Sequence, residues 1–150
     1  MLDVEKLVGR LRGQRVYLDT NIFIYVLNDT PGWAAPSLAL LEACATRRID
    51  GITGDVTLAE LLVRPLQMND GAAVAVVKDL LQHRGVVTLV GHDRSAFERA
   101  ALLRARHGLK MVDALQLATA QGVGARCLIS NDRLFPPLQD IECLNLAGSE

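Results

Sequence analysis

Two short apolar runs in this sequence are each followed by acidic, amide and hydroxyl side chains. The run 16–18 leads into residues 19–21, and the run 127–129 leads into residues 130–132. Such runs are typical of buried strands, and in open parallel sheets ligands bind beyond the carboxyl ends of the strands. We therefore predict that these polar side chains gather at one edge of a sheet. The candidates there are Asp19, Asn21, Ser130 and Asp132.

Two further acids stand among apolar residues in segments with helical periodicity. Glu60 lies within 58–62 and Asp113 within 111–115, where all the flanking residues are apolar. A charge in such surroundings is costly unless a positive group compensates it, and neighbouring carboxylates also repel one another. Oxygen ligands with no His or Cys among them favour Mg²⁺ or Mn²⁺ over zinc. The predicted metal ligands are Asp19, Glu60, Asp113 and Asp132.

Each acid also has a purely structural alternative. Asp19 and Asp132 could cap the helical turns that follow them. Thr57 and Glu60 have the spacing of a capping box, and Asp113 in a first helical turn is favoured by the helix dipole. Capping does not explain why all four acids converge on one edge of one sheet, so we favour the metal site.

The elements that must position these residues alternate along the chain. Helical periodicity predicts helices at 3–12, 22–27, 36–48, 56–66, 72–81, 95–107 and 111–121 and one turn at 133–135. Short apolar runs predict strands at 16–18, 51–53, 86–90, 127–129 and 141–144. Strands that alternate with helices and lack polar alternation indicate a parallel sheet covered on both faces. We predict an α/β fold of three α/β/α layers around four to five parallel strands.

Composition limits the class of protein. A chain of 150 residues, 50% hydrophobic with a mean hydropathy of +0.22, is one folded domain rather than a disordered segment. No apolar run reaches the roughly 18 residues that span a bilayer, and the acidic start of the chain does not resemble a signal peptide. The odd number of cysteines, without C-x-x-C spacing, predicts apolar core thiols in a reducing cytoplasm.

Charge is nearly balanced over the whole chain but not locally. The net charge is −1, whereas the segment 94–110 holds five Arg or Lys residues against one Glu. A metal-filled acidic pocket with a basic surround suits a phosphodiester substrate, and a solvated helix face is the plainer alternative for this segment. We predict that the histidines, His83, His92 and His107, lie at the surface outside the acidic site.

Four segments in this order resemble the PIN domain, in particular the VapC-like toxins of type II toxin–antitoxin pairs. The segments are 17–21, 56–61, 111–120 and 128–135. The resemblance implies a PIN-like, Rossmann-like fold over residues 15–146. Residues 1–14 then form an N-terminal extension, and residues 147–150 form a short tail. Many relatives begin directly at the first strand, so this extension could alter dimer or partner contacts.

The resemblance also implies an activity and partners. It indicates a Mg²⁺- or Mn²⁺-dependent endoribonuclease, usually a homodimer, that a small VapB-like antitoxin inhibits by covering the active-site groove. Asp19, Asp113 and Asp132 would hold one or two ions, and Glu60 would complete the ligand set or orient the attacking water. The hydrogen-bonding groups beside these ligands would be Asn21 and Ser130. The RNA that is cleaved stays open.

Other classes fit less well. A haloacid-dehalogenase-type phosphotransferase needs a second Asp two residues after Asp19, where this chain has Asn21. A receiver domain needs an acid pair after its first strand, and nothing pairs with Asp19 in the adjacent sequence. A catalytically silent PIN-like scaffold that binds RNA or protein remains an alternative, although all four acids are present. The apolar surplus also predicts an exposed patch that a partner covers.

Overall fold

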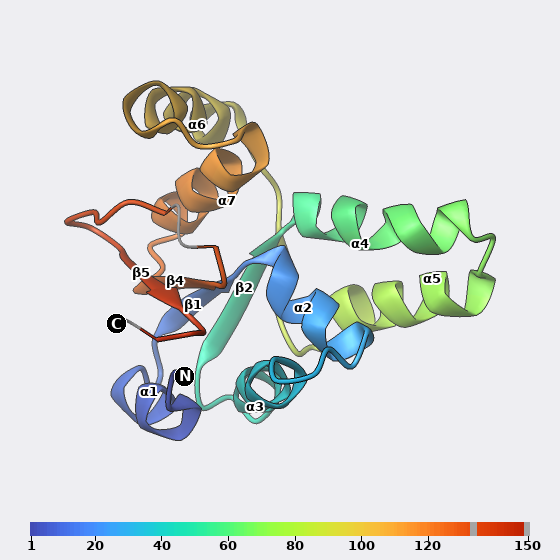
Figure 1. Ribbon diagram of the computed structural model, residues 1–150. Helices are drawn as coiled ribbons and strands as arrows, with labels where there is room; N and C mark the ends of the chain where they lie inside the picture. The colour runs from blue at the N-terminus through green and yellow to red at the C-terminus, as the bar shows by residue number, and fades with distance from the viewer. Residues whose placement is uncertain (133–134, 149–150) are drawn as a thin grey trace.

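The computed structural model describes residues 1–132 and 135–148 and contains one five-stranded sheet (Figure 1). The strand order is β3-β2-β1-β4-β5, and every neighbouring pair is parallel. The strands are β1 (Arg15–Leu18), β2 (Asp50–Gly54), β3 (Thr88–Val90), β4 (Cys127–Ser130) and β5 (Glu142–Asn145). The predicted α/β class and parallel sheet are confirmed. Because β1 lies at the centre, its carboxyl end is flanked by those of β2 and β4.

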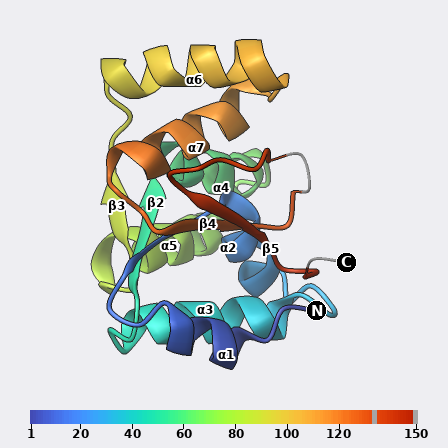
Figure 2. The same cartoon turned by 90° about the vertical axis from the view of Figure 1, so that its left-hand side faces the viewer.

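Helices cover both faces of the sheet, which gives the three predicted layers (Figure 2). The helices are α1 (Val4–Arg10), α2 (Thr20–Leu27), α3 (Ala34–Ala45), α4 (Asp55–Gln67), α5 (Gly71–Lys78), α6 (Arg94–His107) and α7 (Met111–Gly122). The pair α6 and α7 packs on one face, and α1, α2 and α3 pack on the other. The pair α4 and α5 extends sideways from the body as a helical hairpin (Figure 1).

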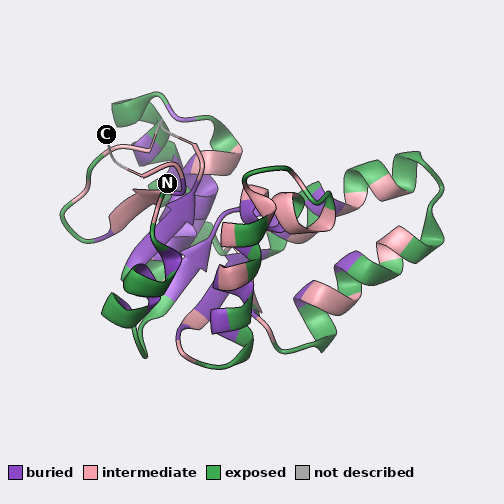
Figure 3. Cartoon of the chain, turned by 60° about the horizontal axis from the view of Figure 1, so that its bottom comes forward, coloured by how far each residue is buried: buried purple, intermediate pink, exposed green. Residues whose placement is uncertain are grey.

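Strand β1 separates two hydrophobic clusters. Val16 and Leu18 belong to the cluster with α1, α2 and α3, whereas Tyr17 belongs to the cluster with α6 and α7. Successive side chains of a strand point to opposite faces, so three consecutive buried residues serve both layers. All three are fully buried, and the central strands form the most buried part of the molecule (Figure 3).

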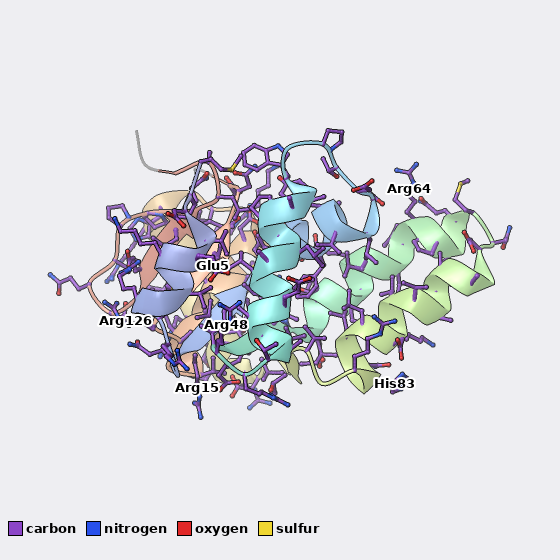
Figure 4. All side chains as sticks on the ribbon, turned by 90° about the horizontal axis from the view of Figure 1, so that it is seen from below. Glu5, Arg15, Arg48, Arg64, His83 and Arg126 are labelled. Atoms are coloured by element: carbon purple, nitrogen blue, oxygen red, sulfur yellow. The ribbon has the colours of Figure 1, made fainter. Side chains whose placement is uncertain are left out.

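The N-terminal helix is part of the core. The predicted helix 3–12 is observed as α1, whose Val4, Leu7 and Val8 are buried. Arg10 forms an ion pair of 2.9 Å with Glu142 on β5. A second ion pair, 3.0 Å between Arg48 and Glu5, joins α1 to the segment before β2 (Figure 4). The segment 1–14 therefore contacts the edge strand β5 through the Arg10–Glu142 ion pair and also packs on one face of the sheet.

One predicted element differs in its type of helix. The helix expected over 72–81 ends as an α-helix at Lys78 and continues as one π-helical turn, η1 (Asp79–His83). Part of the turn expected at 133–135 lies outside the described residues. As predicted, α6 stops at Gly108, which adopts a left-handed φ of 69°. In the described chain, no helix is both long and apolar enough to cross a membrane.

Candidate active site

Asp19 lies at the carboxyl end of β1 and is the N-cap of α2. Its Oδ1 accepts a hydrogen bond of 2.8 Å from the Thr20 amide, and its Oδ2 accepts one of 2.7 Å from the Ser130 hydroxyl. The side chain is buried. Burial raises its pKa, the bonds from Ser130 and Thr20 oppose this, and nearby Glu60 and Asp132 raise it further. Asp19 therefore has the predicted capping role and also faces other acids.

Ser130, the last residue of β4, connects the two strand ends. Its Oγ donates to Asp19 and accepts from the Asn21 side-chain amide at 3.2 Å and from the Asp132 backbone amide at 2.9 Å. Asn21 Oδ1 is buried, and no group in the described chain donates to it. The structure thus brings Asp19, Asn21, Ser130 and the backbone of Asp132 together at one edge.

Glu60 reaches this edge from α4. Its side chain is exposed, but its Oε1 accepts a hydrogen bond of 2.6 Å from the Thr20 hydroxyl. The capping-box alternative for Thr57 and Glu60 is wrong, because α4 begins at Asp55 with Gly54 as its N-cap and Thr57 lies inside the helix. Thr20 therefore contacts two acids, Asp19 through its amide and Glu60 through its hydroxyl.

Asp113 lies in the first turn of α7 and is half-buried. Burial, followed by the charges of Asp19, Asp132 and Glu60, raises its pKa to about 6, while Lys110 opposes the change. The charges of Asp19, Asp132 and Glu60 thus make ionisation of Asp113 less favourable. The four predicted acids lie within electrostatic range of one another, as like charges at one site do.

The donor chemistry of this edge fits a hard divalent cation. Its charged groups are carboxylates, and the buried, unpaired Asn21 Oδ1 adds one more oxygen. Within residues 1–132 and 135–148, however, no group of three or more His, Cys, Asp or Glu side chains is arranged to hold a metal ion. The acids therefore share an edge and repel one another without forming a ready-made chelate.

His92 is half-buried rather than fully exposed, so the predicted surface position holds only in part. Its Nε2 accepts a hydrogen bond of 3.1 Å from the Val56 amide at the start of α4, and its Nδ1 lies 2.6 Å from the Thr119 hydroxyl. Burial lowers its pKa, and Asp55 opposes this. The signal that could have identified it is its position two residues after β3, a strand that ends at the same edge. His83 and His107 are exposed, as predicted.

A second group missed from the sequence is a set of buried polar side chains beneath the acids. Gln116 is fully buried in the otherwise apolar stretch 114–118 of α7. A fully buried glutamine needs several hydrogen-bond partners, and this polar residue inside an apolar run was the available signal. The side chains that surround it are Tyr17, Thr20 and Thr57.

The fold has relatives among solved structures. VapBC2 from Rickettsia felis, bound to a promoter DNA fragment, aligns with a TM-score of 0.69 at 19% identity over 87% of this chain and 98% of that one. VapC20 from Mycobacterium tuberculosis, described as a sarcin–ricin loop cleaving toxin, aligns with 0.61 at 16% identity over 75% and 86%. FitAcB from Neisseria gonorrhoeae aligns with 0.63 at 19% identity over 87% and 96%.

These structural similarities are low in sequence identity and establish the shared fold. No curated protein sequence matches the chain significantly. Residues 16–139 match the PIN domain, and this range runs from β1 past β4 to the segment before β5. It contains all four predicted acids. The chain therefore belongs to the PIN domain family.

Proposed function

We propose that this chain is a Mg²⁺- or Mn²⁺-dependent endoribonuclease and the toxin of a toxin–antitoxin pair. The observation that carries the proposal is the meeting of Asp19, Asn21, Ser130 and the Asp132 backbone at the carboxyl edge of a PIN fold. Nearby like charges at such an edge disfavour one another's ionisation, which a bound cation would relieve. The fold relatives support the activity, because one of them is described as cleaving the sarcin–ricin loop. The free thiols of Cys44, Cys127 and Cys143 agree with action in a reducing cytoplasm.

Each acid of the site would bind the metal ion or orient the attacking water. A bound Mg²⁺ or Mn²⁺ lowers the pKa of a coordinated water and offsets charge that develops on the phosphoryl oxygens. Asp19, Asp113 and Asp132 would hold the ion. Asp19 is kept in one orientation by the Thr20 amide and by Ser130, which leaves further lone pairs on both of its oxygens. Glu60, anchored by Thr20, would orient the attacking water.

Basic residues near the acids support RNA as the substrate. Helix α6 carries exposed Arg94, Arg99, Arg104 and Arg106, and it lies over α7, which holds Asp113 (Figure 2). The loop after α6 leads to Lys110, whose charge lowers the pKa of Asp113. Arg and Lys side chains attract phosphates and steer a polyanion toward an acidic, metal-loaded site. Lys110, at the end of the predicted basic segment 94–110, therefore lies near Asp113 of the acidic edge.

A groove beside Glu60 supports an antitoxin partner. It has a volume of about 830 Å³ and lies between α2, α4 and α5. Its apolar lining includes Ile24, Met68 and Val76, which are exposed, and its polar lining includes Glu60 and Arg64. An apolar helix or extended segment of a VapB-like antitoxin would fill such a groove and end against Glu60. Several fold relatives are toxin–antitoxin complexes.

We also propose that the chain forms a homodimer. Phe97 and Leu102 on α6 and Met111 on α7 are each more than 40% exposed, and α6 and α7 pack against each other, so these side chains could contribute to one apolar contact surface. Burying these side chains against a second copy would remove apolar surface from water. Light scattering at high micromolar concentration tests this point. A particle of 16.3 kDa would contradict it.

The direct test of the activity is RNA cleavage by the purified chain with Mg²⁺ or Mn²⁺ and with excess chelator. Cleavage that requires the ion supports the proposal. A catalytically silent scaffold that binds RNA or protein is the second candidate, and the lack of a preassembled metal cluster in the described residues favours it. A scaffold would bind RNA equally with and without the ion and would leave it intact.

A further inference from the structure

A buried hydrogen-bond network lies directly beneath the acids and joins the elements that carry them. Tyr17 on β1 donates to Gln116 Oε1 on α7. Gln116 Nε2 lies 2.9 Å from Thr57 Oγ1 on α4 and 3.2 Å from Thr20 Oγ1 on α2. All of these side chains are no more than 5% exposed, so bonding to bulk water cannot replace their partners.

The hydroxyl protons of the network follow from the acceptors around them. The Thr53 hydroxyl donates to the Leu18 carbonyl at 2.8 Å, so Thr57 does not accept from Thr53. The Thr57 proton goes either to Thr53 at 2.8 Å or to Thr20 Oγ1 at 3.1 Å. Thr20 gives its only proton to Glu60. Both threonine oxygens can accept from Gln116, whose two amide hydrogens face them.

The orientation of the Gln116 amide follows from this count. A reversed amide would place its oxygen against the Thr20 hydroxyl, whose proton points to Glu60, and would leave the Tyr17 proton without its acceptor. The Tyr17 hydroxyl donates to the Gln116 amide oxygen in the structure, and both side chains are fully buried, so bulk water cannot take the place of either partner. Tyr17 thereby selects the amide orientation that points the Thr20 proton toward Glu60.

We propose that Gln116, oriented by Tyr17, is a positioning residue that fixes Glu60 through the Thr20 hydroxyl; this inference rests on the proposed nuclease function. Glu60 needs such a device because its side chain is exposed and has several rotatable bonds, and the hydrogen bond from Thr20 restrains its Oε1. Thr20 also binds Asp19 through its amide. The network therefore sets the spacing between two acids of the site.

A plain structural role for the network is the alternative, and a pair of substitutions separates the two. Tyr17→Phe and Gln116→Met together remove both partners of a buried bond while keeping similar volumes. Removing both partners of the Tyr17–Gln116 bond avoids leaving either one unsatisfied. Thr20 and Thr57 lose the amide as a donor but keep the protons that they donate themselves. The matched control is Gln121→Met, the same substitution five residues later in α7, where the amide donates to Asp140 at 3.1 Å.

The experiment measures melting temperature and steady-state RNA cleavage in Mg²⁺. We expect the double variant to stay folded, with a moderately lower melting temperature, and to lose kcat by on the order of tenfold to a hundredfold with KM unchanged, as a misplaced catalytic group does. Gln121→Met should match the wild type. In a Glu60→Gln background the double substitution should add no further loss. A folded double variant with wild-type kcat, or an undiminished loss in that background, would overturn the inference.

A second readout keeps this inference separate from the proposed function. The mobility of the Glu60 side chain, followed by NMR relaxation in the metal-free chain, should rise in the double variant and stay unchanged in Gln121→Met. If the wild type cleaves no RNA, the proposed function fails and this readout decides the positioning role alone. If the double variant does not fold, Tyr17→Phe takes its place. A Glu60 side chain as ordered in the variant as in the wild type would contradict the proposal.

Discussion

Removing the Ser130 hydroxyl should destabilise the fold by a predictable amount. Ser130 Oγ donates to the buried carboxylate of Asp19 at 2.7 Å and is itself fully buried. A hydrogen bond to a charged group contributes about 1.5–3 kcal/mol to stability. We therefore expect Ser130→Ala to lower the free energy of unfolding by about 2 kcal/mol, which for a chain of this length lowers Tm by about 4–8 °C.

The effect should also depend on pH, because only the ionised carboxylate needs the donor. Burial already raises the pKa of Asp19, so the carboxyl group begins to protonate at a higher pH than an ordinary Asp. The cost of Ser130→Ala should therefore be largest near pH 8 and shrink as the pH falls and Asp19 protonates.

The matched control for Ser130→Ala is Ser37→Ala on α3. Ser37 is as buried as Ser130, but its hydroxyl has no hydrogen-bond partner in the described chain. Its replacement should leave stability unchanged or raise it. Chemical unfolding of both variants at pH 5 and pH 8 is the assay. Equal costs at the two positions, or a Ser130→Ala cost that does not change with pH, would refute the reasoning about Asp19.

Three further predictions concern pH, packing and metal. Burial lowers the folded-state pKa of His92 below 6.5. Its contribution to the free energy of unfolding is therefore complete above pH 6.5 and is lost as the pH falls toward the lowered pKa. His92→Asn should remove this decline when the free energy of unfolding is measured from about pH 5 to 8. Gly54→Ala would place a Cβ 2.3 Å from the His92 ring and should cost about 1–3 kcal/mol in chemical unfolding, whereas Gly122→Ala, which meets open space, should cost nothing. Millimolar Mn²⁺ should raise Tm through binding at the acidic edge, and Zn²⁺ should not; a melt indifferent to Mn²⁺ would count against the site.

The sequence was sufficient to predict the framework of this site. Apolar runs that end in polar residues predicted β1 and β4, and the helix stop at Gly108 was read from its residue type. These signals are local, because a strand end and a glycine cap depend on a few neighbouring residues. The joint position of Asp19 and Ser130 followed from the parallel topology.

The missed features depend on contacts between distant segments. His92 joins the end of β3 to α4, and Gln116 joins α7 to Thr20 and Thr57, which lie 96 and 59 residues away. No local periodicity encodes such a partner. The capping-box alternative for Thr57 and Glu60 failed for a related reason. The Val56 amide at the start of α4 donates to His92, which lies outside the helix, rather than to a side chain of α4 itself.

The most direct test of the central claim is RNA cleavage by Asp19→Asn. Asn can still accept the bond from the Thr20 amide, so a purely capping role predicts normal activity and a stability loss of only about 1 kcal/mol. A metal-ligand role predicts that cleavage in Mg²⁺ falls on the order of a hundredfold or more while the protein stays folded, and that adding Asp113→Asn lowers it little further. A folded Asp19→Asn variant that cleaves RNA at the wild-type rate would contradict the account.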